Sequence, residues 1–101
     1  MTTDDTRELE GRIVLITGAA QGLGAQMARR FAAAGARVVV ADVDEAGGRA
    51  LAAELPGASF RRLDVTREAD WLAAWDSIER ELGPLRILVN NAGIYKPNIP
   101  L

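Results

Sequence analysis

Three short apolar segments and a shorter, mixed segment at 59–63 alternate along the chain with three segments whose apolar residues recur at helical spacing. The apolar segments show little internal alternation, which is typical of strands covered on both faces, as in a parallel sheet. The segments between them favour helices, and every connection is short. The expected strands are residues 12–16, 37–41, 59–63 and 85–90, and the expected helices are 21–34, 44–55 with Asp44 as its cap, and 66–82 with Thr66 as its cap.

This order of elements predicts an α/β fold with a partial, doubly wound, Rossmann-like parallel sheet. Strands joined through helices run parallel, and such crossovers place helices on both faces of the sheet. The expected strand order is 3-2-1-4, so the order reverses between the first and fourth strands. In open sheets of this kind, ligands bind beside that reversal, outside the carboxyl ends of the strands.

Three glycines lie where the first expected strand turns into the first expected helix. Glycine allows a tight turn and the close approach of a second body, and a helix N-terminus attracts a phosphate through its unpaired N–H groups. We therefore expect a pyrophosphate-binding turn. Its expected contact residues are Gly18, Ala20, Gln21, Gly22, Leu23 and Gly24. The spacing differs from the common Gly-x-Gly-x-x-Gly pattern, and a plain strand–helix turn with small residues for packing is the alternative.

Three further loops that leave the carboxyl ends of expected strands carry residues suited to a nucleotide. They hold Asp42 and Val43, then Asp64 and Val65, then Asn91, Ala92 and Gly93. A carboxylate at Asp42 can accept hydrogen bonds from the 2′- and 3′-hydroxyls of an adenosine ribose and repel a 2′-phosphate. The alternative for Asp42 is a helix-capping or solvent-facing role, and for Asp64 it is a place in the capping region of the third helix.

The composition excludes several other chemistries for this chain. Without cysteine or histidine it has no disulfide, no thiolate or imidazole and no Cys/His metal site, and we expect no metal. The net charge of −2 comes from interspersed acids and bases, with no basic patch that would indicate nucleic acid. No apolar run is long enough to span a membrane, and residues 1–10 lack the pattern of a signal peptide, so we expect a cytoplasmic protein.

Three motifs resemble those of the short-chain dehydrogenase/reductase family. They are Thr17-Gly18-x-x-x-Gly22-x-Gly24, Asp64-Val65 and Asn90-Asn91-Ala92-Gly93, and the resemblance extends over residues 10–95. It implies that Asp64 bonds the adenine amino group, that Val65 packs on the ring, and that residues 91–93 line the ribose and the nicotinamide. Asn90 is expected to be structural and to hydrogen-bond neighbouring backbone. The Asp64-Val-Thr stretch with Asp70-Trp71 is similar to bacterial hydroxysteroid and 3-oxoacyl reductase members.

The cofactor and the catalytic residues are also predicted from this resemblance. Family members that prefer a 2′-phosphate often carry a basic residue at Gln21 or Val43, and neither is basic here, so we expect NAD. The family's catalytic tyrosine precedes a lysine by one helical turn, beyond the fourth strand. Here Tyr95 is directly followed by Lys96 and Pro97, which cannot present both side chains on one helix face. We therefore assign no catalytic residue.

The sequence thus predicts the NAD(H)-binding portion of an enzyme that transfers hydride between NAD(H) and a secondary alcohol or ketone. We expect a flexible leader at 1–10, an NAD-binding half-domain at 11–95 and a truncated loop at 96–101. The chain alone is expected to be inactive, and its parent to be a homo-oligomer acting on a small molecule. Trp71 and Trp75 are expected to be packing residues. The alternative is a non-catalytic nucleotide-binding or interaction fragment that associates through the apolar edge of its fourth strand.

Overall fold

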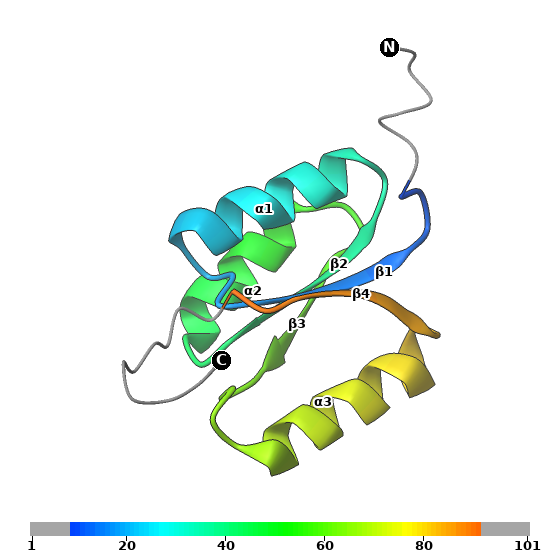
Figure 1. The fold of residues 1–101 in the computed structure, drawn as a ribbon. Coiled ribbons are helices and arrows are strands. Elements are labelled where there is room, and N and C mark those ends of the chain that lie inside the picture. Colours follow the sequence, from blue (N-terminus) through cyan, green and yellow to red (C-terminus); the bar gives the residue numbers. More distant parts are fainter. Residues whose placement is uncertain (1–8, 92–101) are drawn as a thin grey trace.

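Four parallel strands form the centre of the molecule (Figure 1). The computed structural model describes residues 9–91. The strands are β1 (Ile13–Thr17), β2 (Arg37–Asp42), β3 (Ser59–Arg62) and β4 (Leu85–Val89). Their order across the sheet is β3-β2-β1-β4, which confirms the predicted order and places the reversal between β1 and β4. For each of the four strands, both predicted ends lie within one residue of the observed ends.

Helices cover both faces of the sheet, as predicted (Figure 1). They are α1 (Gly22–Ala33) and α2 (Glu45–Glu54) on one face and α3 (Glu68–Glu81) on the other. All five residues of β1 are buried. Val14 and Ile16 belong to the apolar cluster under α1 and α2, whereas Ile13 and Leu15 belong to the cluster under α3. The unbroken apolar run of β1 therefore reflects a strand that faces two cores.

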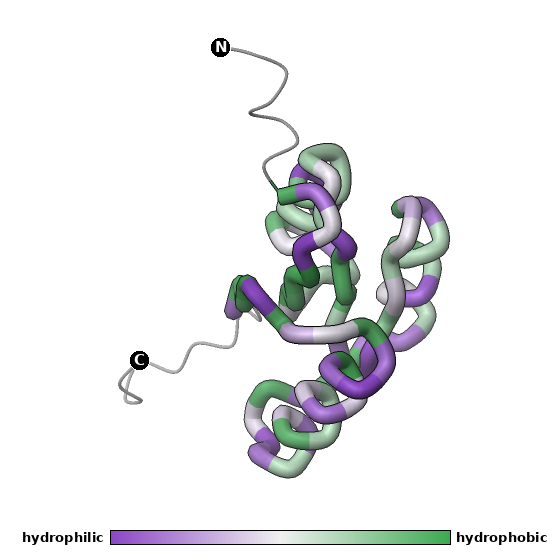
Figure 2. The backbone as a smooth tube through the Cα atoms, turned by 90° about the vertical axis from the view of Figure 1, so that its right-hand side faces the viewer, coloured by the Kyte–Doolittle hydropathy of each residue, from purple (hydrophilic) through white to green (hydrophobic). Residues whose placement is uncertain are grey.

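The helices themselves are amphipathic, and Figure 2 shows their coils alternating between hydrophobic and hydrophilic residues. None of the helices within residues 9–91 is long and apolar enough to cross a membrane. Gly35, with a φ of 95°, follows the end of α1 as predicted. The Asp44 side chain accepts a hydrogen bond from the Gly47 N–H at 3.0 Å, which confirms it as the cap of α2.

The predicted cap of α3 was wrong. The residue before the helix is Arg67, and no side chain caps it, although Glu68 and Asp70 lie in the first turn as expected. The Thr66 hydroxyl instead donates to Oδ1 of Asp64, two residues earlier, at 2.6 Å. A local bond of this kind competes directly with helix capping for the same short side chain.

Gly48 lowers the helix propensity of α2 but allows the helix to pack closely on β3. A Cβ atom built at Gly48 would collide with the ring of Phe60. Arg49 also contacts the Phe60 ring, and its guanidinium carbon lies 5.2 Å from the centre of that ring. Gly48 is unfavourable for helix propensity, but it is required here because the Phe60 ring leaves no room for a side chain.

Gly48→Ala should therefore destabilise the protein by about 1–3 kcal/mol through overpacking against Phe60. Helix propensity alone predicts the opposite, a gain of about 1 kcal/mol. Urea unfolding followed by circular dichroism measures the difference. The exposed Ala53, on the same helix, supplies the control, because Ala53→Gly should show the ordinary propensity loss of about 1 kcal/mol. A more stable Gly48→Ala variant would contradict the packing explanation.

Strand β4 is less covered than its apolar sequence predicts. Among the described residues it pairs with β1 alone, and Leu88 is 42% exposed. Its register with β1 shifts between Ile13 and Val14, which pair with Leu85 and Ile87, so that Arg86 has no partner residue in β1. This irregularity is a β-bulge, a common feature of sheet edges.

Candidate functional site

The carboxyl ends of β1 and β4 are joined through the buried hydroxyl of Thr17. This oxygen accepts a hydrogen bond from the Asn91 N–H at 2.9 Å and donates to Oδ1 of Asn90 at 3.0 Å. Asn90 was expected to bond neighbouring backbone, whereas its partner here is a side chain. Thr17 is a residue whose role the sequence reasoning missed. Its signal was a hydroxyl at the end of an otherwise apolar buried strand.

The glycine turn between β1 and α1 lies directly beside this junction. Gly18 and Gly22 have φ values of 62° and 64°, which favour glycine. Gly24 is needed for a different reason, because an added Cβ would collide with the Gly18 carbonyl oxygen and come within 2.6 Å of Nδ2 of Asn91. The same Asn91 Nδ2 lies 3.5 Å from the Gly18 carbonyl oxygen, so the first and fourth predicted loops are in contact.

The N-terminus of α1 is open to an anion. Gln21 occupies the cap position with extended backbone, its side chain makes no capping bond, and the first turn contains no acidic residue. The N–H groups at a helix start that lack a side-chain acceptor carry a partial positive charge. Leu23 is well exposed on this first turn, as expected for a residue that offers only backbone to a ligand.

Asp42 connects the end of β2 to the glycine turn. Its Oδ2 accepts a hydrogen bond from the Ala20 N–H, and its Oδ1 accepts one from the Asp44 N–H, both at 3.0 Å. A carboxylate offers about four acceptor positions, so two of them stay open for further donors. Asp42 is therefore not the helix cap, which is Asp44, and it is not merely solvent-facing. The adjoining Val43 is exposed on the same loop.

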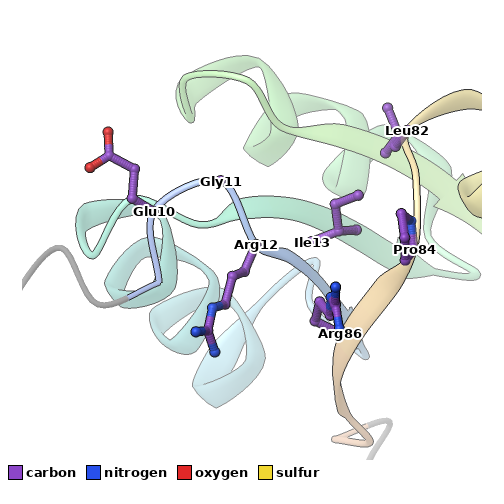
Figure 3. Close-up of a pocket in the computed structure, with 7 residues that line it drawn as sticks. All are labelled: Glu10, Gly11, Arg12, Ile13, Leu82, Pro84 and Arg86. Atoms are coloured by element: carbon purple, nitrogen blue, oxygen red, sulfur yellow. The ribbon is translucent and has the colours of Figure 1, made fainter.

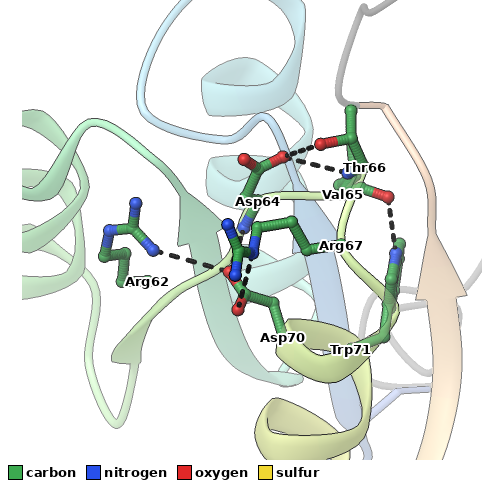
Figure 4. A network of polar contacts seen from close by, with 7 residues as sticks. All are labelled: Arg62, Asp64, Val65, Thr66, Arg67, Asp70 and Trp71. Atoms are coloured by element: carbon green, nitrogen blue, oxygen red, sulfur yellow. Dashed lines mark hydrogen bonds and ion pairs between the residues drawn. The ribbon is translucent and has the colours of Figure 1, made fainter.

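Asp64 and Val65 lie in the turn that connects β3 to α3, within a network of polar contacts (Figure 4). Oδ1 of Asp64 accepts bonds from both the hydroxyl and the N–H of Thr66, at 2.6 and 3.0 Å. The hydroxyl first, then the N–H, lower the pKa of the Asp64 carboxyl below its usual value of 3.8, and Arg67 and Arg62 add to this, whereas partial burial opposes it. The carboxyl is therefore ionised at neutral pH, and Oδ2 has no donor among the described residues.

Thr66→Ala should raise the Asp64 pKa toward 3.8, because it removes the donor with the largest effect. A carboxyl with a lowered folded-state pKa stabilises the fold above its unfolded pKa, and this stabilisation is lost as the pH falls through the folded value. The variant should therefore be less stable than the wild type above about pH 4, and this difference should disappear as the pH falls through the folded-state pKa of the wild type. Carbon-13 NMR titration of the Asp64 carboxyl measures the shift. Thr66→Ser, which keeps the hydroxyl, should retain the low pKa, and an equal rise in both variants would contradict the assignment.

Two of the predicted site residues, Ala92 and Gly93, lie outside the described residues, as do Tyr95 and Lys96. The others follow the carboxyl ends of the four strands, with direct contacts between the loops after β1 and β2 and between those after β1 and β4. Residues 9–91 contain no group of three acidic, histidine or cysteine side chains that could hold a metal ion.

A cavity of about 520 Å³ lies elsewhere, at the amino ends of β1 and β4 (Figure 3). It is lined by Glu10, Gly11, Arg12, Ile13, Leu82, Pro84 and Arg86. None of the predicted site residues contributes to it, and it is at the edge of the sheet opposite the glycine turn. The uncapped N-terminus of α1 thus lies at the carboxyl ends of the strands, away from this cavity.

Comparisons with known proteins agree with this geometry. A family model described as short chain dehydrogenase matches residues 12–100. L-fucose dehydrogenase of Oryctolagus cuniculus is 52% identical over 91 residues, which are 90% of this chain and 32% of that protein. The 3-beta-hydroxysteroid dehydrogenase of Comamonas testosteroni is 45% identical over 93 residues, 91% of this chain and 37% of that protein.

A solved structure shows the same relationship in three dimensions. The hydroxysteroid dehydrogenase from Escherichia coli matches with a TM-score of 0.83 and 36% sequence identity, over 98% of this chain and 45% of that one. The chain thus spans about a third of the length of these two curated relatives and under half of this structural neighbour.

Proposed function

Because the chain belongs to the short-chain dehydrogenase family, we propose that it forms the NAD(H)-binding part of an enzyme that transfers hydride between NAD(H) and a secondary alcohol or ketone. The family generally uses NAD or NADP, and the choice of NAD is the more specific part of the proposal. Two relatives carry names that refer to L-fucose and to hydroxysteroids, both small molecules with hydroxyl groups, which supports the substrate class.

The observation that carries the proposal is the uncapped N-terminus of α1 beside the Asp42 carboxylate. The two groups are held together, because Ala20 of the glycine turn donates its N–H to Asp42 at 3.0 Å. Helix N–H groups without a side-chain cap suit a pyrophosphate, and a neighbouring carboxylate suits ribose hydroxyls. The close approach of Gly24 to the Gly18 carbonyl oxygen leaves no room for a side chain at position 24.

The residues present fit a dinucleotide. Gly18, Gly22 and Gly24 with the N–H groups at the start of α1 would hold the pyrophosphate, Asp42 the adenosine ribose, and Asp64 and Val65 the adenine. We propose that Asn91, with Ala92 and Gly93, lines the nicotinamide side. When bound, the cofactor supplies the hydride chemistry, and this part of the chain orients it. The proposed binding unit is residues 11–95, and a cytoplasmic, homo-oligomeric parent remains a prediction from the sequence.

Asp42 should set the preference between the two cofactors. We expect the protein to bind NAD more tightly than NADP, and Asp42→Ala to weaken NAD by about tenfold and reduce the preference, because it removes both an acceptor for the ribose and the repulsion of a 2′-phosphate. Isothermal titration calorimetry with both cofactors measures the ratio of the two dissociation constants.

Asp42→Ala also leaves the Ala20 and Asp44 N–H groups without their acceptor, which should cost about 1–3 kcal/mol of stability. Asp44→Ala is the matched control, since losing a cap costs a similar amount, about 1 kcal/mol, without removing the ribose acceptor. The control should keep the wild-type ratio of NAD to NADP affinity. An unchanged ratio in Asp42→Ala would rule out its role in cofactor choice.

A second candidate function, association through the β4 edge, is favoured by one observation, the 42% exposure of Leu88 on a strand paired on one side within residues 9–91. Apolar edge strands invite pairing with another chain. If this is the function, Leu88→Lys should convert a concentration-dependent dimer into a monomer in sedimentation experiments, while NAD affinity stays the same. A chain that is monomeric at all concentrations would exclude this candidate.

A separate assay, NADH oxidation with a panel of ketones, tests whether the chain alone catalyses hydride transfer.

A further inference from the structure

The first turn of α3 holds the Asp64–Val65 turn at two successive backbone groups (Figure 4). Oδ2 of Asp70 accepts a hydrogen bond from the Asp64 N–H at 3.0 Å. The indole Nε1 of Trp71 donates to the Val65 carbonyl oxygen at 2.9 Å. We propose that Asp70 and Trp71 are positioning residues, a clamp that fixes this turn so that Asp64 and Val65 present their side chains to the adenine. The inference rests on the proposed function of nucleotide binding.

Asp70 is itself held from both sides of the turn. Its half-buried carboxylate lies 3.4 Å from a guanidinium nitrogen of Arg62, at the end of β3, and 3.9 Å from one of Arg67, before α3. Exposed ion pairs of this kind contribute little to stability individually. Here the two arginines favour one orientation of a carboxylate that also accepts the Asp64 N–H, so the Asp64 amide has an acceptor that is itself held in place.

Trp71 reaches the turn from the opposite side, and its ring is anchored. The half-buried ring packs against the apolar cluster between α3 and the sheet, which contains Leu15, Leu63 and Ile78. Because this side chain is large and has few rotatable bonds, its ring N–H is held in position to donate to the Val65 carbonyl oxygen. Trp75, one turn later, is 38% exposed and has no hydrogen bond among the described residues. Trp71 is therefore a packing residue, as expected, and it also donates a hydrogen bond to the Val65 carbonyl oxygen.

The clamp determines which atoms of the turn remain available. The Asp64 N–H and the Val65 carbonyl are occupied by α3, and Oδ1 of Asp64 is occupied by Thr66. What the turn leaves available is Oδ2 of an ionised carboxylate beside the half-buried side chain of Val65, part of which packs against the apolar cluster under α3. An acceptor beside an apolar surface suits a flat ring that carries an amino donor, as adenine does. A purine with a carbonyl oxygen in place of that amino group would face the carboxylate with an acceptor instead of a donor.

The test compares NAD with nicotinamide hypoxanthine dinucleotide, whose purine carries a carbonyl oxygen in place of the amino group and a proton on the adjacent ring nitrogen. Nicotinamide mononucleotide, which lacks the purine, is the reference ligand. Trp71→Phe keeps the ring and removes the donor, and Trp75→Phe on the same helix is the matched control. Asp70→Ala removes the acceptor, and Asp70→Asn restores a neutral one for the Asp64 N–H.

We expect Trp71→Phe and Asp70→Ala to weaken NAD about five- to tenfold, the effect of one lost hydrogen bond on the position of the turn. The preference for NAD over its hypoxanthine analogue should shrink by a similar factor, while affinity for nicotinamide mononucleotide stays unchanged. Asp70→Asn should recover most of the preference, and Trp75→Phe should match the wild type. Circular dichroism at the assay temperature identifies any variant that is unfolded. If Trp71→Phe or Asp70→Ala is unfolded, the other of these two variants is used for the comparison.

The two proposals can fail separately. If the wild type binds none of these nucleotides, the proposed function is overturned and the clamp with it. If the wild type binds NAD and Trp71→Phe behaves as Trp75→Phe does, the clamp alone is overturned. Equal losses for NAD and nicotinamide mononucleotide would indicate general loosening of the fold, and they would also overturn the positioning role.

Discussion

The complete burial of β1 is the constraint on which the rest of the structure depends. A strand with a core on each face and a parallel neighbour on each edge has no freedom to shift, because a slip of one residue would exchange its two sets of side chains. Its carboxyl end is therefore fixed, and with it the start of the glycine turn. Thr17, the last and only polar residue of the strand, extends this rigidity to β4 by using its hydroxyl as both acceptor and donor.

The order of the elements, the end of α1 at Gly35 and the N-terminal cap of α2 at Asp44 were predictable because they depend on local periodicity and on contacts within a few residues. The cap at Thr66 was mispredicted for a related reason. The Thr66 hydroxyl can either cap the helix or donate to the Asp64 carboxylate, and the sequence does not show which of the two bonds forms. The role of Gly48 could not be predicted, because the Phe60 ring that requires it comes from the next strand.

The candidate site shows the same division. Residue types at the carboxyl ends of strands indicated which loops would meet, since parallel strands bring these ends to one edge. The bonds that hold the loops together depend on tertiary distances: Asp42 to Ala20, Asn91 to Gly18, and Trp71 to Val65. The burial of β4 was also overestimated. An apolar sequence indicates that a strand favours burial, but it does not identify the segment that would cover it.

The double attachment of Asp42 has a consequence for how cofactor preference changes during evolution or engineering. The side chain that would discriminate against a 2′-phosphate also ties the loop after β2 to the turn before α1. A single replacement that accommodates the larger cofactor would at the same time remove the acceptor of the Ala20 N–H, in the turn that we propose holds the pyrophosphate. Conversion of specificity in this scaffold therefore calls for a paired change: one residue to accept the phosphate and a second to supply the acceptor that Ala20 loses.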